Sequence, residues 1–264
     1  MRSGKWFHVS VVFLVLVYLF VPLLATFLYS IATDWYRTIL PEGFTLAWYR
    51  DLLLDPRFVD AAGRTIFVCT AAILISVAVM VPTIFLVTVY FPKWERLLQA
   101  LTMLPYAVPG VVAAVALIRM YSDGPLVLAG TVWLLIGAYF VSILPFMYQG
   151  IRNSLRTIDA IRLTDAAELL GASKWQAFRL VVLPNILPGV IVSILLSFSM
   201  LFGEFVLANL LIGGHYELLQ VYLMRRMSES GHLSSAIVVA YFVLILIMSG
   251  MVLKFSRSAK GAKL

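Results

Sequence analysis

The stretch DAAELLGASKWQAFRLVVLP, residues 165–184, is the most polar sustained stretch between two strongly apolar segments of the chain. Ser173 followed by Gln176 has the spacing of a capping box, so a helix is predicted to begin there and to run as far as Pro184. Gly171 permits the backbone conformation that a sharp reversal needs. The stretch therefore predicts a short helix, a tight turn and a second helix that leads into the next apolar segment.

The first helical piece carries acidic and small apolar residues close together. Asp165 and Glu168 are expected in its first turn, where negative charge suits the helix N-terminus. A small apolar surface is expected beside them, formed by Ala166, Ala167, Leu169 and Leu170. An ordered polar segment of this kind, kept outside an apolar protein, predicts a knob that inserts into a groove on another protein.

The rest of the chain is too apolar for a soluble domain. Of its 264 residues, 62% are hydrophobic and only 12% are charged, and a soluble domain of this length needs a more polar surface. The apolar residues come in long runs, as a membrane-spanning helix of about 20 residues requires. The sequence therefore predicts an all-α polytopic membrane protein, with a single transmembrane domain over residues 1–264.

Six membrane-spanning helices are predicted from the apolar runs. They are expected near residues 8–31, 65–91, 97–120, 126–151, 186–211 and 233–253, with the polar loop 152–185 between the fourth and the fifth. Two basic residues precede the first run, as in a signal peptide, but the run from Val9 to Ile31 is longer than a typical signal-peptide core. The first run is therefore expected to remain in the protein as a membrane helix.

An even number of spans places both termini on one side of the membrane, and the basic residues decide which side. The segments beside the termini are 1–7, 92–96, 152–185 and 254–264, which hold 2, 2, 5 and 4 basic residues, together 13 of the 20. The opposite side holds the other 7, and it holds 8 acidic residues against 4 on the first side. The positive-inside rule therefore places both termini and the loop 152–185 in the cytoplasm.

Two segments on the opposite side are expected to lie at the membrane surface. Within 32–62 a short amphipathic helix is predicted, with Trp48 and Tyr49 suited to the headgroup zone. Within 212–232 the pair Gly213-Gly214 predicts a turn before a short amphipathic piece. This second segment is either a plain loop with an interfacial helix or part of a surface that meets another protein.

Several kinds of site find no support in the sequence. The lone cysteine, Cys69, lies inside an apolar run, which excludes a disulfide framework. The histidines are too scattered to bind a metal together: His8, His215 and His232. There is no G-x4-G-K-[ST] motif and no Ser/His/Asp or paired-carboxylate arrangement, so no ATP site, catalytic residue or cofactor is expected on this chain. The net charge of +7 follows membrane topology and does not indicate nucleic acid.

The third apolar run begins LTMLPYAVPG, residues 101–110. Pro105 and Pro109 each remove a backbone donor and Gly110 adds flexibility, so the helix is expected to break there. Such breaks persist at membrane depth only where protein or a water-filled cavity satisfies the freed carbonyl groups. The break is therefore either a packing kink or part of a transport pathway.

Glu204, in SFSMLFGEFVLANLL, is the only ionisable residue well inside a predicted span. A carboxylate at that depth costs about 2.5–3.5 kcal/mol, so it is expected to face the bundle interior or a water-filled cavity. Gly203 allows a neighbouring helix or a solute to approach closely, and Asn209 adds a polar group to the same helix. Glu204 is therefore either part of a translocation route or a structural acid with a hydrogen-bonded partner.

The residue types and their spacing in the stretch 165–184 resemble a known family motif. The stretch reads Asp165-Ala166-Ala167, three residues, Gly171, nine residues, Val181, one residue and then Leu183-Pro184. This resembles the EAA loop of bacterial ABC-importer permeases, which is written E-A-A-x3-G-x9-I-x-L-P. The chain departs from the pattern at Asp165, in place of Glu, and at Val181, in place of Ile, and both changes are conservative.

The resemblance implies the six-span fold of a type I importer permease in a bacterial inner membrane. It implies that the loop is a coupling helix that docks onto a cytoplasmic ATPase dimer, whose subunits bind ATP and Mg²⁺. The residues expected to make or shape that contact are Asp165, Ala166, Ala167, Glu168, Leu169, Gly171, Leu183 and Pro184. A second homologous permease subunit, identical to this chain or different from it, and an extracytoplasmic solute-binding protein complete the expected complex.

Two further phrases narrow the resemblance. ILPEGFTLAWYRDLL (39–53) and SDGPLVLAGTVWLLIGAYFVSILPFMY (122–148) are similar to permeases for polyamines, aminoalkylphosphonates, ferric iron and thiamine. They look closest to the 2-aminoethylphosphonate permeases, while the whole-length pattern also fits the second permease subunit of spermidine/putrescine importers. The expected solute is therefore a small amine-bearing molecule, with ferric iron or thiamine as alternatives.

Polyamine permeases have acids near the position of Glu204, which suits a solute that carries an ammonium group. The residues expected along the pathway are Glu204, Gly203, Pro105, Pro109 and Asn209. A self-sufficient secondary carrier is a further alternative. Such a carrier usually shows internal repeats with intramembrane charges at matching places, whereas this chain shows one acid and no clear repeat.

Overall fold

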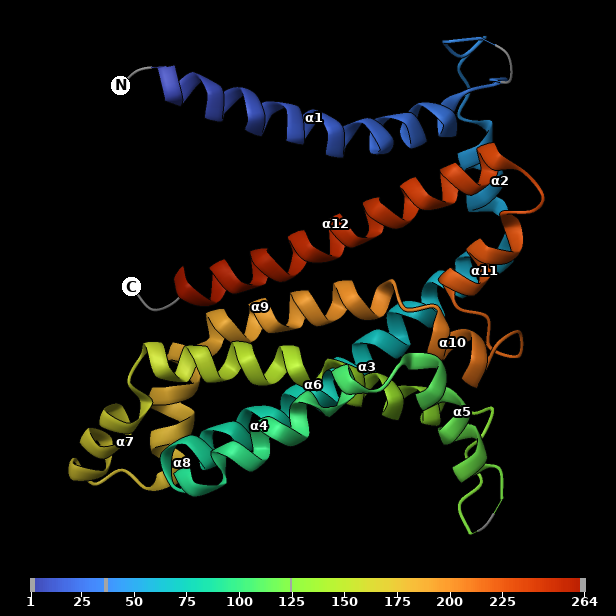
Figure 1. Cartoon of the computed structure of the whole chain (residues 1–264). Helices are drawn as coiled ribbons and strands as arrows, with labels where there is room; N and C mark the ends of the chain where they lie inside the picture. The colour runs from blue at the N-terminus through green and yellow to red at the C-terminus, as the bar shows by residue number, and fades with distance from the viewer. Residues whose placement is uncertain (1–2, 36–37, 124, 262–264) are drawn as a thin grey trace. The chain divides into compact units, whose positions relative to one another are not determined.

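The computed structural model describes residues 3–35, 38–123 and 125–261 of the chain (Figure 1). In these ranges the chain forms helices joined by short loops, with one isolated antiparallel bridge between Ala32 and Phe44. The prediction of an all-α polytopic membrane protein is confirmed. The chain divides into two compact units. One holds the residues up to Asp60 with Tyr222–Leu244, and the other holds Ala61–Val221 with the residues from Ile245 onward.

The first unit is built from α1 (Ser3–Ile31), α2 (Ala47–Leu54) and the first part of α12 (Gly231–Gly261). In its most apolar stretch α1 has no residue buried by the rest of the described chain. A helix that is apolar and uncovered in this way is suited to lipid or to another membrane helix. The short helix α2 falls within the segment 32–62, where an amphipathic helix was predicted.

A stack of rings closes the first unit. His232 at the start of α12 is buried, and its ring lies 4.0 Å from that of Tyr29 and 5.6 Å from that of Trp48, both in stacked geometry. The indole N–H of Trp48 donates a hydrogen bond to the carbonyl of Ala32 at 2.9 Å. Trp48 is therefore half-buried, with its ring packed against His232.

The second unit holds most of the remaining helices. In chain order they are α3 (Pro56–Val89), η1 (Pro92–Trp94), α4 (Glu95–Met103), η2 (Leu104–Ala107), α5 (Gly110–Tyr121), α6 (Val132–Thr157), α7 (Ala160–Leu169), α8 (Lys174–Gln176), the π-helical segment η3 (Ala177–Val182), α9 (Leu183–Phe202), α10 (Val206–Leu211) and α11 (Leu219–Arg226). The first residues of α3 and the last residues of α11 belong to the first unit.

Helices long and apolar enough to span a membrane number five in the described part of the chain. They are His8–Ile31, Pro56–Val89, Val132–Thr157, Lys174–Phe202 and Gly231–Met251. A sixth candidate is the pair Pro92–Ala107 and Gly110–Tyr121, which pass the same criterion together but are bent by 101°. The count of five or six agrees with the predicted fold class.

Two of these helices begin at other residues than the sequence predicted. α3 begins at Pro56 rather than near 65, because Asp55 caps its first turn by accepting a backbone hydrogen bond at 2.9 Å, and because proline suits the first helical position. α6 begins at Val132 rather than near 126, because the hydroxyl of Thr131 accepts a hydrogen bond from a backbone N–H one turn later, at 3.4 Å. Capping residues thus decide both starts.

The third predicted span, 97–120, is not one straight helix. α5 leaves α4 and η2 at an angle of 101°. The change of direction between the green helices α4 and α5 can be followed in Figure 1. Pro105 and Pro109 supply no backbone N–H, and Pro109 has an extended ψ of 138° as the N-cap of α5, so the helical ladder ends at Ala107. The break predicted from the two prolines is confirmed, and it is far sharper than a kink.

The fifth predicted span, 186–211, is interrupted near its end. α9 stops at Phe202, Gly203 is its C-cap, and α10 begins only at Val206. Glu204 was predicted inside a helix. The structure instead places it in the break between these two helices, because its carboxylate caps α10, as described below.

The helix that leads into this span was predicted to end at Pro184, but it does not stop there. It runs without a break from Lys174 to Phe202 through η3. A proline ring clashes with the preceding turn of a regular α-helix, and a π-helical turn is wider. Asn185 Nδ2 donates to the carbonyl of Val181 at 2.7 Å, which satisfies an acceptor in the distorted turn.

α6 and α9 cross in close contact at four small residues. A Cβ atom at Gly150 would lie 1.9 Å from Ser193 Oγ, and one at Gly189 would lie 1.6 Å from Ser154 Oγ. Each serine hydroxyl donates to a glycine carbonyl one turn earlier in its own helix, at 2.9 Å in α6 and 3.0 Å in α9. Small residues at this spacing let two helix backbones approach closely. The crossing therefore fixes the base from which the polar loop between α6 and α9 projects.

Candidate functional site

The polar loop forms a helix–turn–helix. α7 ends in a Schellman motif, in which the N–H of Gly171 donates to the carbonyl of Glu168 at 2.9 Å and the N–H of Ala172 donates to that of Ala167 at 3.0 Å. Gly171 has a φ of +88°, which only glycine adopts without strain. The turn predicted at this glycine is confirmed.

We call α7 the first arm of this loop and the helix that begins at Lys174 its second arm. The second arm starts at the predicted capping box. The backbone N–H of Ser173 donates to Gln176 Oε1 at 2.8 Å, and the backbone N–H of Gln176 donates to Ser173 Oγ at 3.3 Å. The first arm differs from the prediction. α7 begins at Ala160, so Asp165 and Glu168 lie in its second half and not in its first turn. The start lies earlier because Asp159, in the left-handed region at φ 49°, ends the preceding helix and precedes a new one.

Large apolar side chains are exposed at the tip of this helix pair. Leu169 is 88% exposed, Leu170 is 90% exposed and Trp175 is 62% exposed. We call these three residues the apolar knob. Asp165 and Ala166 are exposed beside it, whereas Ala167 is buried against the loop's second arm and is not part of the apolar surface that the sequence predicted. Water-exposed leucine and tryptophan side chains gathered in this way are typical of a protein contact.

The two remaining residues of the EAA-like pattern lie at the base of the loop. Leu183 and Pro184 are half-buried where η3 continues into α9. They are therefore placed to shape the second arm and to connect it with the membrane helix. The predicted loop residues thus lie along one helix–turn–helix, with the apolar knob at its tip and Pro184 at its base.

A cavity of about 800 Å³ is the second candidate site. It lies between α5 and the N-terminal half of α6, and residues of α4, η2, α9 and α10 complete its wall. Pro105 and Glu204, both predicted along a pathway, are among its lining residues. The other three predicted residues have different places: Pro109 is the N-cap of α5, Gly203 is the C-cap of α9, and Asn209 is exposed on α10.

Two helix breaks meet at this cavity. The α4–α5 break contributes Pro105, and the α9–α10 break contributes Glu204. A Cβ atom at Gly110, the first residue of α5, would lie 3.7 Å from Val206 Cγ1, the first residue of α10. The lining is otherwise mostly apolar and includes the rings of Tyr106 and Trp133. One acidic residue, Glu204, is therefore part of the lining of a mostly apolar cavity.

The carboxylate of Glu204 accepts hydrogen bonds from three groups of the protein. Its Oε1 accepts a hydrogen bond from the backbone N–H of Leu207 at 2.9 Å, and its Oε2 accepts one from that of Ala208 at 3.1 Å. The hydroxyl of Tyr139, which is buried on α6, donates to Oε2 at 3.3 Å. The carboxylate thus satisfies two free N–H groups at the start of α10, where negative charge is favoured.

Two hydrogen bonds to acidic site residues, one to Glu204 and one to Glu168, could not be predicted from the sequence. Tyr139 and Tyr90, whose hydroxyl donates to Glu168 Oε1 at 2.7 Å, are aromatic residues within or beside apolar runs. Their partners are 65 and 78 residues away in the chain, and only packing brings them together. No spacing or motif marks either tyrosine.

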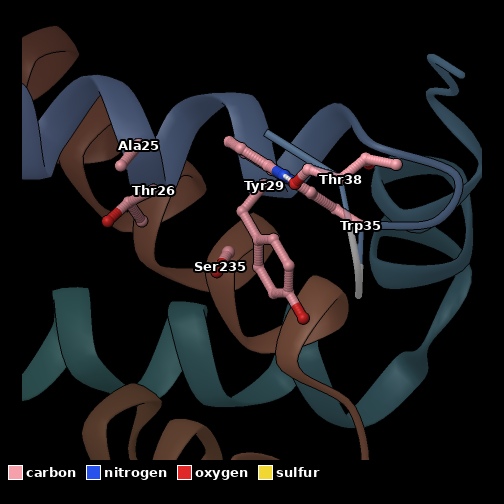
Figure 2. Close-up of a pocket in the computed structure, with 6 residues that line it drawn as sticks. All are labelled: Ala25, Thr26, Tyr29, Trp35, Thr38 and Ser235. Carbon is pink, nitrogen blue, oxygen red and sulfur yellow. Dashed lines mark hydrogen bonds between the residues drawn. The ribbon is translucent and has the colours of Figure 1, made fainter. Parts of the chain in front are cut away.

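A smaller cavity of about 430 Å³ lies in the first unit (Figure 2). Figure 2 shows Tyr29 and Trp35 among its lining residues, and the indole N–H of Trp35 donates to the carbonyl of Thr38 at 3.0 Å. Its six lining residues carry no charge: Ala25, Thr26, Tyr29, Trp35, Thr38 and Ser235. Within residues 3–35, 38–123 and 125–261, no three His, Cys, Asp or Glu side chains are grouped to hold a metal ion.

Two solved structures share the fold. A bacterial ABC transporter that imports the acidic polysaccharide alginate aligns with 97% of this chain and 98% of its own, at a TM-score of 0.73 and 18% identity. The MetNI methionine ABC transporter aligns with 76% of this chain and 95% of its own, at a TM-score of 0.64 and 17% identity. At these identities the likeness establishes the fold, which is that of ABC-importer permeases.

Curated relatives align with most of the chain. PhnV of Salmonella paratyphi A, whose name provisionally assigns it to 2-aminoethylphosphonate transport as a permease, is 30% identical over 203 residues, 77% of this chain and 75% of its own. PotC of Haemophilus influenzae, a spermidine/putrescine transport system permease, is 27% identical over 207 residues, 78% of this chain and 79% of its own.

A family model extends over more than half of the chain. The model for the binding-protein-dependent transport system inner membrane component matches residues 80–261, from the second half of α3 to the end of α12. This range includes the helix pair with its apolar knob and the cavity beside Glu204. The chain therefore belongs to this family, and it is the non-catalytic, multi-pass inner-membrane permease subunit of a binding-protein-dependent ABC importer.

Proposed function

We propose that this permease imports a small solute that bears an amine, either a polyamine such as spermidine or putrescine, or 2-aminoethylphosphonate. The observation that carries the proposal is that Glu204 is the one acidic residue in the lining of a mostly apolar cavity. The names of PhnV and PotC support the same class of solute. An extracytoplasmic binding protein delivers the solute, and a second homologous permease subunit, identical or different, forms the other half of the pathway.

The carboxylate retains capacity for an ammonium group. Two carboxylate oxygens offer about four acceptor positions, and the hydrogen bonds from Leu207, Ala208 and Tyr139 use three. An ammonium group would be attracted more strongly here than in water, because the cavity wall is mostly apolar. The rings of Tyr106 and Trp133 in the same wall offer faces for a cation–π contact.

The proposal has a second part: a cytoplasmic ATPase dimer docks on the loop that carries the apolar knob and supplies the energy for transport. Leu169, Leu170 and Trp175 are exposed to a degree that suits burial in a groove of a partner, here a cytoplasmic ATPase dimer. ATP and Mg²⁺ bind to that partner. The distribution of basic residues supports a cytoplasmic position for the loop and for both termini.

The solute class is tested on the cognate binding protein. Its thermal unfolding is followed with putrescine, spermidine, 2-aminoethylphosphonate, thiamine and ferric citrate in separate samples. We expect an upward shift of the midpoint with an amine-bearing solute, since a bound ligand stabilises the native state. A shift with thiamine alone or with ferric citrate alone contradicts the proposal.

The role of Glu204 is tested by Glu204→Gln in the complete importer, reconstituted in vesicles. Glutamine keeps one carbonyl oxygen for the N–H groups of α10 but removes the charge. We expect uptake of the solute to fall by about tenfold, the effect of losing one charged contact, while the ATPase and the second permease still co-purify. Unchanged uptake, or loss of assembly, shows that the carboxylate serves only the helix break.

A further inference from the structure

Tyr90, the first residue after α3, contacts both arms of the α7–α8 helix pair. Its hydroxyl donates a hydrogen bond to Oε1 of Glu168 on α7 at 2.7 Å. Nζ of Lys174 on α8 lies 4.6 Å from the centre of its ring. One phenol at the end of a membrane helix therefore holds the two arms of the loop that carries the apolar knob.

A series of rings leads from α3 to the same knob. Phe85, buried on α3, has its ring 5.8 Å from that of Tyr90 and 4.7 Å from that of Phe178 on η3. The ring of Phe178 lies 5.5 Å from that of Trp175, a knob residue. Aromatic rings at these distances are in favourable packing contact. The end of α3 and the tip of the loop are thus joined by continuous side-chain contact.

The chain connectivity explains why such a link matters. α7 follows α6 within a few residues, and η3 continues directly into α9. A displacement of the knob therefore passes to α6 and α9 through the backbone. α3 ends before η1 and is separated from α7 by several helices in the sequence, so a displacement reaches it through side chains.

In the hydrogen bond between Tyr90 and Glu168, the phenol of Tyr90 remains the donor. Partial burial, the hydrogen bond to Glu168 and the negative charges of Glu168 and Asp165 raise the pKa of Tyr90 to about 12. The phenol therefore keeps its proton at cytoplasmic pH and always acts as the donor. A hydrogen bond to a charged acceptor is also stronger than one between neutral groups.

We propose that Tyr90 is a positioning residue that links the α7–α8 helix pair to α3, so that movement of the docked ATPase is passed to this membrane helix. The inference rests on the proposed contact between the apolar knob and an ATPase. It adds to that contact a defined route into α3, through Glu168 and Lys174 on one side and Phe85 on the other.

The chain contains its own reporter for this route. Cys69 is the only cysteine of the sequence, and it is buried on α3. Its modification by N-ethylmaleimide, measured by mass spectrometry, reports how often α3 exposes it. The rate is compared with and without ATP and vanadate, in the purified complex of the permease with its cognate ATPase. This readout needs no knowledge of the solute.

The main variant is Tyr90→Phe, which removes the hydroxyl and keeps the ring. We expect ATP and vanadate to change the modification rate of Cys69 in the wild type, and we expect this change to shrink by about threefold or more in the variant. The rate without nucleotide and the amount of co-purified ATPase should stay the same. Tyr18→Phe, at a side chain that is 78% exposed on α1, is the control without effect.

Glu168→Ala is the second variant, and the double variant completes the cycle. If the two residues act through one hydrogen bond, the double variant is no worse than either single variant. The inference is overturned if Tyr90→Phe keeps the full nucleotide response, if the wild type shows none, or if the variant loses its ATPase. Failure of the wild type to bind any ATPase would instead refute the proposed docking, and with it this route.

Discussion

Asp55 is the residue on which the end of α2, the start of α3 and the end of α11 converge. Its Oδ2 accepts hydrogen bonds from the hydroxyl of Tyr222 and from Nη2 of Arg226, both at 2.7 Å, and its Oδ1 accepts one from the backbone of α3. Burial alone would raise the pKa of Asp55, but these hydrogen bonds outweigh it and hold the pKa below the ordinary value. The ionised carboxylate therefore stabilises the first unit.

The sign of this shift predicts a dependence on acid. A pKa lowered by folding contributes stability that is present above the ordinary value of 3.8 and is lost as the pH falls through the lower, folded value. We expect the unfolding midpoint in detergent to vary little between about pH 7 and about pH 5 and to drop below about pH 4. Asp55→Asn should remove this part of the drop, at a cost of about 1 kcal/mol or more at neutral pH.

Asp34→Asn is the matched control, because Asp34 is exposed in the loop before α2. It should leave the midpoint and its dependence on acid unchanged. The same steep loss below about pH 4 in Asp55→Asn as in the wild type would show that other carboxylates cause it.

The crossing of α6 and α9 gives a second prediction at single residues. A Cβ atom at Gly189 would lie 2.8 Å from the Cβ of Ser154 as well as 1.6 Å from its Oγ, so rotating the hydroxyl does not relieve the clash. We expect Gly189→Ala to destabilise the protein by about 1–3 kcal/mol, as overpacking does. Thermal unfolding in detergent measures the loss.

Ser154→Gly should restore most of that stability when it is combined with Gly189→Ala, because it removes both clashing atoms. Gly63→Ala is the control: in the described chain, apart from its chain neighbours and the backbone of its own helix turn, no atom lies within 4 Å of a Cβ at Gly63. A loss in Gly189→Ala that Ser154→Gly fails to reverse would place the cause elsewhere than at this crossing.

Local rules predicted the residues whose partners are near in sequence. The capping box of Ser173 and Gln176 and the left-handed turn at Gly171 follow from spacing and backbone preference, and both are present. Tyr139 and Tyr90 were not predicted, since tertiary packing alone selects their partners. Glu204 was recognised as unusual, but its role as a cap depends on a helix break that its sequence neighbours do not announce.

At the scale of elements, the helix pair α7–α8 predicts how the ATPase is held. Leu170 is 90% exposed, so Leu170→Asp should leave the fold unchanged while it places a charge in the proposed contact. We expect the amount of co-purified ATPase to fall by about tenfold. The membrane-inserted amount of the permease, measured by immunoblot, should stay constant.

Ile39→Asp is the matched control for this variant. Ile39 is 93% exposed in the loop between α1 and α2, outside the helix pair. Equal loss of the ATPase in both variants would point to a general effect of the added charge. Full retention in Leu170→Asp would exclude the apolar knob as the contact.

Helix existence was predictable, whereas helix continuity was not. Long apolar runs gave five of the helices near their observed places, since a run of this length has few other structures open to it. Two prolines indicated a break in the third span, but the angle of 101° depends on what the surrounding helices leave open. Pro184 predicted a helix end, and the chain avoids it by widening into η3.

At the scale of the whole molecule, the charge distribution predicts the orientation. Glu217→Cys, just before α11, should react from outside the cell with a membrane-impermeant maleimide, and Lys260→Cys should react only after the membrane is opened. The natural Cys69 is buried, so its background is low. Reaction of Lys260→Cys from outside, with protection of Glu217→Cys, would reverse the topology.

The sharp bend after η2 has a consequence for the lipid around the protein. α4 has nine residues and η2 has four. α4 begins at Glu95, which forms an ion pair with Arg152. The leg made of α4 and η2 is about 20 Å long, whereas the hydrocarbon core is about 30 Å thick. The bilayer next to this leg is therefore expected to thin locally. Short-chain lipids relieve that mismatch, and uptake should be fastest in the thinner of two otherwise equal bilayers.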